Sequence, residues 1–324
     1  MKKHETLFYS FLKEIEQKIP LKTEIVNNLA RMLNIDEKAV YRRLSGDVPL
    51  TFHEAVTISK QLDISLDNID ISNSSPSFKP DLIEYINLAE SDFALLNEMT
   101  TILNSLKDVP DAEGGEITNL LPQPLYLPYE SLFRLDLFRW KYQFNTTNKV
   151  IPYKDIFITD KLRKKLDENV KCAKYLQTNY FFDNQIFSFL VTDLKYFYSA
   201  GLITNEELRL IKLDLLKVLE DIDILSQSGI FKETQKRIDI YISNVKVDTS
   251  YVYIDAPNYQ LTIVKAFLIN GIATRGTKTF EELKRKVQSL KRQSVLITGS
   301  SEKERIKFLK EQCDAIKSLS QLKS

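Results

Sequence analysis

Residues 29–46 read LARMLNIDEKAVYRRLSG, and this stretch decides the fold of the N-terminal part of the chain. Leu29 and Leu33 lie four residues apart and therefore share the buried face of one helix. Asn34 tolerates the left-handed backbone that ends a helix abruptly, and Asp36 is placed to cap the helix that follows. The spacing thus predicts two short helices joined by a tight turn.

The second of these helices, which starts after Asp36 and ends at Gly46, has an inward and an outward side. Val40 and Leu44 lie one turn apart and point inward, so Lys38 and Arg42 lie near the centre of the opposite side. Two cations one turn apart can donate hydrogen bonds to guanine edges and to phosphates in a major groove of DNA. The candidate DNA-contacting residues are Lys38, Ala39, Tyr41, Arg42, Arg43 and Ser45.

A further helix follows this pair. Thr51 and Glu54 have the spacing of a capping box, and an inward stripe follows at Ala55, Ile58 and Leu62. With an amphipathic helix before the pair and one more short helix starting at Ser65, we expect a compact bundle of five helices over residues 1–70.

This bundle resembles the Cro/repressor-type (XRE-like) helix-turn-helix family of transcriptional regulators, over residues 4–70 only. The residues that carry the resemblance are Leu29-Ala30, the turn at Asn34-Ile35, Val40, Gly46 and the run from Pro49 to Ser65. The resemblance implies that the second helix of the pair lies in the major groove of double-stranded DNA. Three features depart from the family pattern. The inward residues Val40 and Leu44 are four apart instead of three, which can roll the helix and shift its outward face by about one position. Val26 stands where a phosphate-contacting glutamine is common, and Glu37 brings a negative charge to the groove side.

Residues 71–80 (ISNSSPSFKP) are rich in serine and contain two prolines, which predicts a linker between two domains. Over residues 81–106, apolar residues alternate in steps of four and three, which predicts one long helix. Its apolar seam can pair two subunits in a homodimer, although a helix folded onto its own domain has the same pattern. The seam consists of Leu82, Ile86, Ala89, Phe93, Leu96 and Leu103.

The remaining chain is expected to form a loop over residues 107–129 and a mainly helical domain over residues 130–324. The loop is predicted from four prolines and the Gly114-Gly115 pair. Helices are expected at residues 130–144, 160–176, 184–200 and 205–226. Residues 237–247 and 250–254 alternate β-branched or aromatic with polar residues, which predicts a small antiparallel sheet turning at Asp248-Thr249. The expected fold is therefore mainly α, with a helical N-terminal bundle and an α+β C-terminal domain.

Composition narrows the function classes. The only two histidines, His4 and His53, both precede the large domain, so a histidine base or a histidine-ligated metal cannot come from that domain's own residues. No nucleophile with a base and no phosphate-binding glycine loop stands out, so we expect neither an enzyme nor a bound cofactor or metal. No apolar run approaches the roughly 20 residues of a membrane span. We therefore expect a cytoplasmic protein with no membrane partner.

Two functional hypotheses follow. The first is a sequence-specific transcriptional regulator that binds double-stranded DNA as a homodimer and senses a small-molecule effector, or assembles, through its C-terminal domain. Ten Lys and Arg stand against eleven Asp and Glu over residues 1–70, so the groove-facing cations must dominate any such binding. The alternative is a protein-interaction scaffold that keeps the helical bundle without reading DNA. The many aromatic residues after position 130 can line a ligand cavity or simply form a core.

Overall fold

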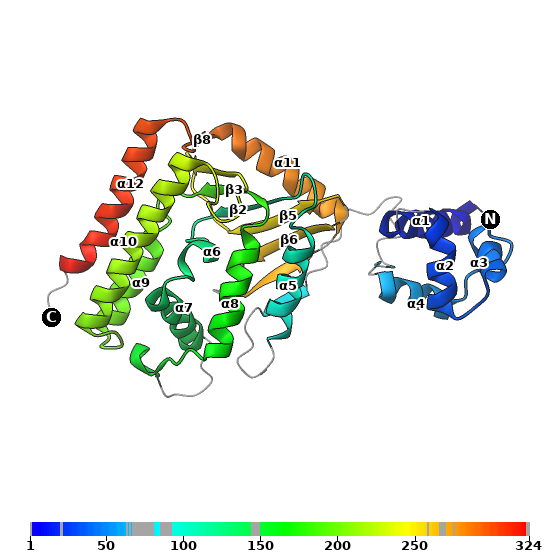
Figure 1. Cartoon of the computed structure of the whole chain (residues 1–324), viewed down its shortest axis with the longest axis horizontal. Helices are drawn as coiled ribbons and strands as arrows, with labels where there is room; N and C mark the ends of the chain where they lie inside the picture. The colour runs from blue at the N-terminus through cyan, green and yellow to red at the C-terminus, as the bar shows by residue number, and fades with distance from the viewer. Residues whose placement is uncertain are drawn as a thin grey trace. The chain divides into compact units, whose positions relative to one another are not determined.

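The computed structural model divides the chain into two units, Met1–Ser77 and Phe78–Ser324, each with its own hydrophobic core (Figure 1). The structure describes residues 2–19, 22–62, 64, 66, 81–84, 93–143, 150–257, 259–265, 270–274 and 276–321. The predicted linker, residues 71–80, lies outside the described residues. Among the described helices, none combines the length and apolar character of a membrane span.

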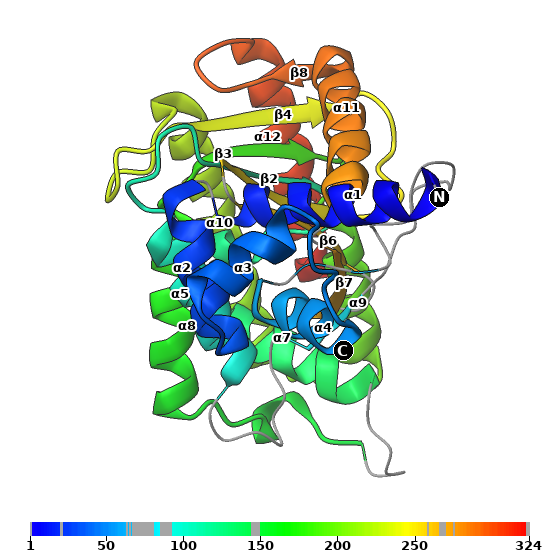
Figure 2. The same ribbon diagram turned by 90° about the vertical axis from the view of Figure 1, so that its right-hand side faces the viewer.

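The N-terminal unit is a bundle of helices. Its described elements are α1 (Lys2–Lys18), α2 (Lys22–Leu33), α3 (Glu37–Leu44) and α4 (Phe52–Leu62). They pack around Ile15, Leu29, Val40 and Ile58, each at most 2% exposed. Figure 2 shows α1 running across the other three helices. The fifth helix expected from Ser65 falls on residues of which the structure describes only Leu66.

The C-terminal unit is built on one eight-stranded sheet of order β1-β7-β6-β5-β2-β3-β4-β8. β2, β3 and β4 are parallel neighbours, and every other pairing is antiparallel. The strands are β1 (Asp81–Glu84), β2 (Glu113–Thr118), β3 (Gln177–Phe182), β4 (Ile238–Ser243), β5 (Tyr251–Ala256), β6 (Tyr259–Lys265), β7 (Asn270–Thr274) and β8 (Ser294–Leu296).

The predicted small antiparallel sheet is therefore wrong. The two predicted strands exist as β4 and β5, but they do not form a hairpin, because β2 and β3 lie between them in the sheet. A parallel strand buried on both faces lacks the alternation that marks a half-exposed strand. The sequence from Gln177 to Phe182 (QTNYFF), which forms β3, is buried at five of its six positions and gave no such alternation.

The prediction of a loop over residues 107–129 also fails, because this segment contains β2 at the centre of the sheet and the short helix α6 (Gln123–Tyr126). The Gly114-Gly115 pair serves close packing and does not make a turn. A Cβ atom built on Gly115 would lie 2.3 Å from a ring carbon of Tyr253 on β5, so only glycine fits under that ring.

The single long helix over residues 81–106 is not formed. Residues 81–84 are strand β1, paired antiparallel with β7, and α5 begins only at Ala94 and ends at Ser105. Residues 85–92 lie outside the described residues, so Ile86 and Ala89 of the predicted seam do as well. Phe93 and Leu96 are 8% and 2% exposed and belong to the core of their own unit, which closes that part of the seam to a second subunit.

The sheet has a thick helical layer on one face and one helix on the other (Figure 1). α11 (Thr277–Gln293) covers the second face, where Phe280 and Val287 pack against Phe181 and Tyr241. α12 (Glu302–Lys317) packs against α10 on the opposite side of the sheet. The helical layer also contains α7 (Glu130–Gln143), α8 (Asp160–Ala173), α9 (Ser188–Ser199) and α10 (Asn205–Ser228), close to the four expected ranges.

Candidate functional site

The turn between α2 and α3 fixes how α3 is presented. Asn34 has φ 52°, and the N–H of Ile35 donates to the carbonyl oxygen of Ala30 at 3.1 Å, which is the longer of the two bonds of a Schellman helix end. Asp36 Oδ1 accepts from the N–H of Ala39 at 2.8 Å and caps α3. The chain thus leaves α2 and enters α3 with little freedom at the joint.

The outward side of α3 is open. Lys38, Tyr41, Arg42 and Ser45 are exposed, Tyr41 at 60%, and Ala39 is half-buried between them. The opposite side is closed, because Val40 is 1% exposed in the bundle core. The structure therefore gathers five of the six candidate residues, Lys38, Ala39, Tyr41, Arg42 and Ser45, on or beside one surface.

Arg43, the sixth candidate, is used inside the bundle. Its Nε donates to Glu54 Oε1 at 2.8 Å, a terminal nitrogen lies 2.7 Å from the same oxygen, and the other donates to the carbonyl of Ala39. The remaining oxygen of Glu54 accepts from the N–H of Thr51 at 2.8 Å and caps α4, as the predicted capping box requires. The Arg43 guanidinium holds the pKa of Glu54 below its usual value. Arg43 thus fastens α3 to α4.

One exposed aromatic residue of the N-terminal unit escaped sequence reasoning. Phe52, the first residue of α4, is 82% exposed. The available signal was an apolar residue at the first position of a capped helix, three places before the inward stripe begins at Ala55.

The second candidate site is a cavity of about 160 Å³ inside the C-terminal unit. It lies between the sheet and helices α5 to α8 of the thick helical layer, and most of its wall is apolar. The sequence indicated only that aromatic residues after position 130 can line such a space, and of those Phe133, Tyr180 and Tyr253 do. The polar residues in its wall are Glu116, Gln123, Asp136, Asn169, Thr178, Tyr180, Tyr253 and Lys265.

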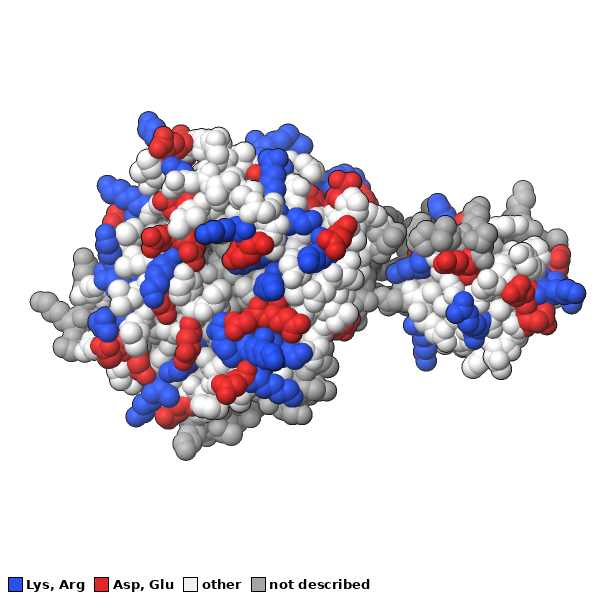
Figure 3. Space-filling view, viewed as in Figure 1, with Lys and Arg blue, Asp and Glu red and all other residues white. Residues whose placement is uncertain are grey.

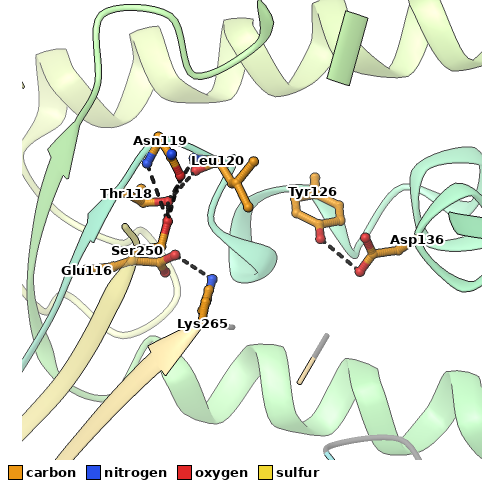
Figure 4. A network of polar contacts seen from close by, with 8 residues as sticks. All are labelled: Glu116, Thr118, Asn119, Leu120, Tyr126, Asp136, Ser250 and Lys265. Carbon is orange, nitrogen blue, oxygen red and sulfur yellow. Dashed lines mark hydrogen bonds and ion pairs between the residues drawn. The ribbon is translucent and has the colours of Figure 1, made fainter. Parts of the chain in front are cut away.

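Two buried charged groups meet at this cavity on the sheet side. Lys265 Nζ, at the end of β6, lies 2.5 Å from Glu116 Oε1 on β2. The side chains are 14% and 6% exposed. On the helix side, Asp136 Oδ2 of α7 accepts from the hydroxyl of Tyr126 at 2.9 Å. Figure 4 shows Glu116 and Asp136 directing their carboxylates toward one another from the two sides.

Asp136 is less well neutralised than Glu116. Burial raises its pKa, and the nearby guanidinium of Arg139 offsets that effect only in part. Arg139 lies 3.8 Å from Asp136 Oδ1 but only 2.8 Å from Asp193, so its charge is shared. The hydroxyl of Tyr126 has a raised pKa for the same reason, burial beside the Asp136 carboxylate.

A separate polar network lies at the carboxyl end of β2 (Figure 4). Thr118 Oγ1 and Ser250 Oγ are 2.9 Å apart, and the Ser250 hydroxyl lies 3.0 Å from Asn119 Oδ1. Thr118 Oγ1 also accepts from the N–H of Leu120 at 2.9 Å. These groups form hydrogen bonds with one another, so the network joins the end of β2 to the start of β5.

Over the described ranges, no group of three or more His, Cys, Asp or Glu side chains could hold a metal ion. On the face of the C-terminal unit seen in Figure 3, Lys and Arg alternate with Asp and Glu, so that face has no extended patch of one sign. The chain matches no known protein family, no curated protein and no solved structure at a significant level.

Proposed function

We propose that the protein is a sequence-specific DNA-binding transcriptional regulator in which α3 enters the major groove. The observation that carries the proposal is the combination of an open cationic side on α3 with three fixed joints. These are the turn at Asn34, the cap at Asp36 and the Arg43–Glu54 pair. A reader helix must be held rigidly while its outward side chains stay free.

The two exposed cations have different expected roles. Arg42 can form a two-point contact with a guanine edge, because the guanidinium is a planar fork of donors. Lys38 is a point charge near the helix start and suits a phosphate. Removing Arg42 should therefore cost about 1–3 kcal/mol on the preferred sequence only, whereas removing Lys38 should weaken all sequences alike.

We further propose that the C-terminal unit senses a small-molecule effector, because an enclosed and mostly apolar cavity with a few polar groups is the usual form of a ligand site. Two subunits on one palindromic site would bind more tightly than one, so a homodimer remains part of the proposal. Its contact surface must lie outside Phe93 and Leu96, which are buried in their own unit.

The test is selection of DNA from a random duplex library by the full chain, followed by titration of the selected sequence at several salt concentrations. We expect a preferred sequence, and a salt dependence that Lys38→Ala reduces by about one ion. The double variant Lys38→Ala, Arg42→Ala should lose the preference. Arg31→Ala removes an exposed guanidinium from α2 and serves as the matched control, with unchanged binding.

A chain that enriches no sequence, and whose weak binding the double variant leaves unchanged, would contradict DNA readout. The bundle would then be the interaction scaffold of the alternative hypothesis.

A further inference from the structure

The cavity of the C-terminal unit has the size of a small organic molecule. A cavity of about 150 Å³ lined by apolar side chains holds a benzene-sized molecule, and the present one measures about 160 Å³. Its apolar wall includes Leu96 and Met99 of α5, Val170 of α8 and Ile263 of β6. An occupant therefore has an apolar body of about six to eight heavy atoms.

The polar end of the cavity contains more acceptors than donors. Two carboxylates, Glu116 and Asp136, stand against the single ammonium of Lys265 in the wall. Lys265 contacts Glu116 Oε1, and among the described residues no hydrogen bond or ion pair reaches Glu116 Oε2. Asn169 uses its amide nitrogen on Thr100 Oγ1, so its carbonyl oxygen is the group left for the cavity.

Tyr180 gives an independent indication of a missing polar partner. Its side chain lies in the cavity wall and is 4% exposed, and within the described ranges its hydroxyl makes no hydrogen bond. Burial and the nearby charge of Glu116 both raise its pKa, so the hydroxyl is neutral and keeps its proton. This hydroxyl is therefore free to form a hydrogen bond with a polar group bound in the cavity.

From these observations we infer that the cavity binds a small primary amine, with its apolar body among Leu96, Met99 and Val170 and its ammonium group at Glu116, on the side of the cavity that faces Asp136. The three N–H donors of an ammonium group match the surplus of acceptors, and its charge balances the surplus carboxylate. A carboxylate ligand at Glu116 would instead be repelled by that carboxylate and by Asp136 across the cavity.

This inference deepens the sensing role proposed for the C-terminal unit. It does not depend on DNA, so a test in the absence of DNA separates its failure from failure of the proposal for α3. The chain offers a specific readout, because its single tryptophan, Trp140, lies on α7 of the C-terminal unit. Trp140 fluorescence during heating of the full chain therefore follows that unit alone.

Three probes share one ring and differ in head-group charge: benzylamine, benzyl alcohol and benzoate. At about 10 mM, binding with a Kd near 1 mM should raise the melting temperature of a unit of this size by about 3–5 °C. We expect that shift with benzylamine, a smaller one with benzyl alcohol and none with benzoate. Glu116→Gln should weaken benzylamine binding about tenfold. Glu113→Gln, the same change on β2 at a residue outside the cavity wall, should leave it unchanged.

Val170→Phe provides a second, independent variant, because a phenyl ring there fills the cavity without removing a charge. It should abolish the benzylamine shift while the melting temperature without ligand holds or rises. Equal shifts with benzylamine and benzoate, no shift with benzylamine at this concentration, or a benzylamine shift that survives both Glu116→Gln and Val170→Phe would each overturn the inference.

Discussion

A glutamate paired with a cation lies partly buried in each unit, and the two pairs differ in what surrounds them. In the N-terminal unit, Arg43 and Glu54 lie 2.7 Å apart with side chains 18% and 13% exposed. In the C-terminal unit, Lys265 and Glu116 lie 2.5 Å apart and are 14% and 6% exposed. Distance and burial are similar, so these quantities alone do not tell a structural pair from a functional one.

The two pairs differ in how many hydrogen-bond partners the glutamate oxygens have. Both oxygens of Glu54 accept hydrogen bonds, one from the Arg43 guanidinium and the other from the Thr51 N–H. Glu116 shares one oxygen with a flexible lysine and faces empty space. We call Arg43–Glu54 the saturated pair, because both carboxylate oxygens have partners, and Lys265–Glu116 the unsaturated pair. The saturated pair, held by a planar guanidinium, fixes two helices, whereas the unsaturated pair beside a cavity can accept a ligand.

The largest expected effect comes from breaking the saturated pair. Glu54→Ala removes the α4 cap and leaves the half-buried guanidinium of Arg43 without its partner, so we expect a loss of about 2–3 kcal/mol in the stability of the N-terminal unit. Hydrogen exchange of peptides from α3 and α4 in the full chain measures this loss. Glu24→Ala, an exposed acid on α2, is the control and should change exchange little. Equal exchange in the two variants would show that the pair does not fasten the helices.

A conservative change should have a smaller effect. Arg43→Lys keeps the charge but loses the fork, so a single ammonium cannot hold both Glu54 and the Ala39 carbonyl. We expect a loss of about 1 kcal/mol, by the same exchange measurement. Full protection in Arg43→Lys would mean that charge alone suffices at this joint.

The unsaturated pair should tolerate the matching change better. In Glu116→Gln the amide can still accept from Lys265, and the adjoining cavity leaves room for both groups to adjust. Melting followed by Trp140 fluorescence should show a loss of at most about 1 kcal/mol in the C-terminal unit. A loss as large as that of Glu54→Ala would mean that the Lys265–Glu116 pair is structural after all.

The sequence predicts the N-terminal unit better than the C-terminal unit, because the contacts that define the first join residues close together in the sequence. The turn at Asn34, the cap at Asp36 and the box of Thr51 with Glu54 are formed between residues at most five apart, so spacing alone located them. The cavity joins Glu116 with Lys265, 149 residues later, and no local pattern links the two. The sheet order was missed for the same reason, since Gly115 on β2 pairs with Tyr253 on β5.

Some signals for the cavity were present in the sequence. Asp136 stands between Leu135 and Leu137 in an aromatic-rich helix, and Lys265 follows the apolar pair Ile263-Val264 at the end of a strand. A charge inside an apolar run of a buried element is a candidate for a buried functional group. What could not be predicted is that the two elements meet, because β6 and α7 approach only through the completed sheet.

The smallest expected effect is a pH dependence of the N-terminal unit. The pKa of Glu54 is lowered in the folded protein from its ordinary 4.5, chiefly by the hydrogen bond from Arg43. The pair therefore adds stability that is fully present above pH 4.5 and is lost as pH falls through the folded pKa. Exchange in α3 should rise more steeply below pH 4.5 in the wild type than in Glu54→Gln. Parallel pH profiles of exchange in the two proteins would show that the ionisation of Glu54 adds no stability.

The neighbours Arg42 and Arg43 allow the most direct test of DNA reading by α3. The guanidinium of Arg42 is exposed to solvent, whereas that of Arg43 is bound to Glu54. Affinity for the selected DNA sequence at about 0.15 M salt should fall about 10- to 100-fold in Arg42→Ala while hydrogen exchange of α3 stays unchanged. Arg43→Ala should instead speed exchange in α3 and α4. Full affinity and selectivity in Arg42→Ala, with a stable α3, would contradict the role of this helix as the reader of DNA.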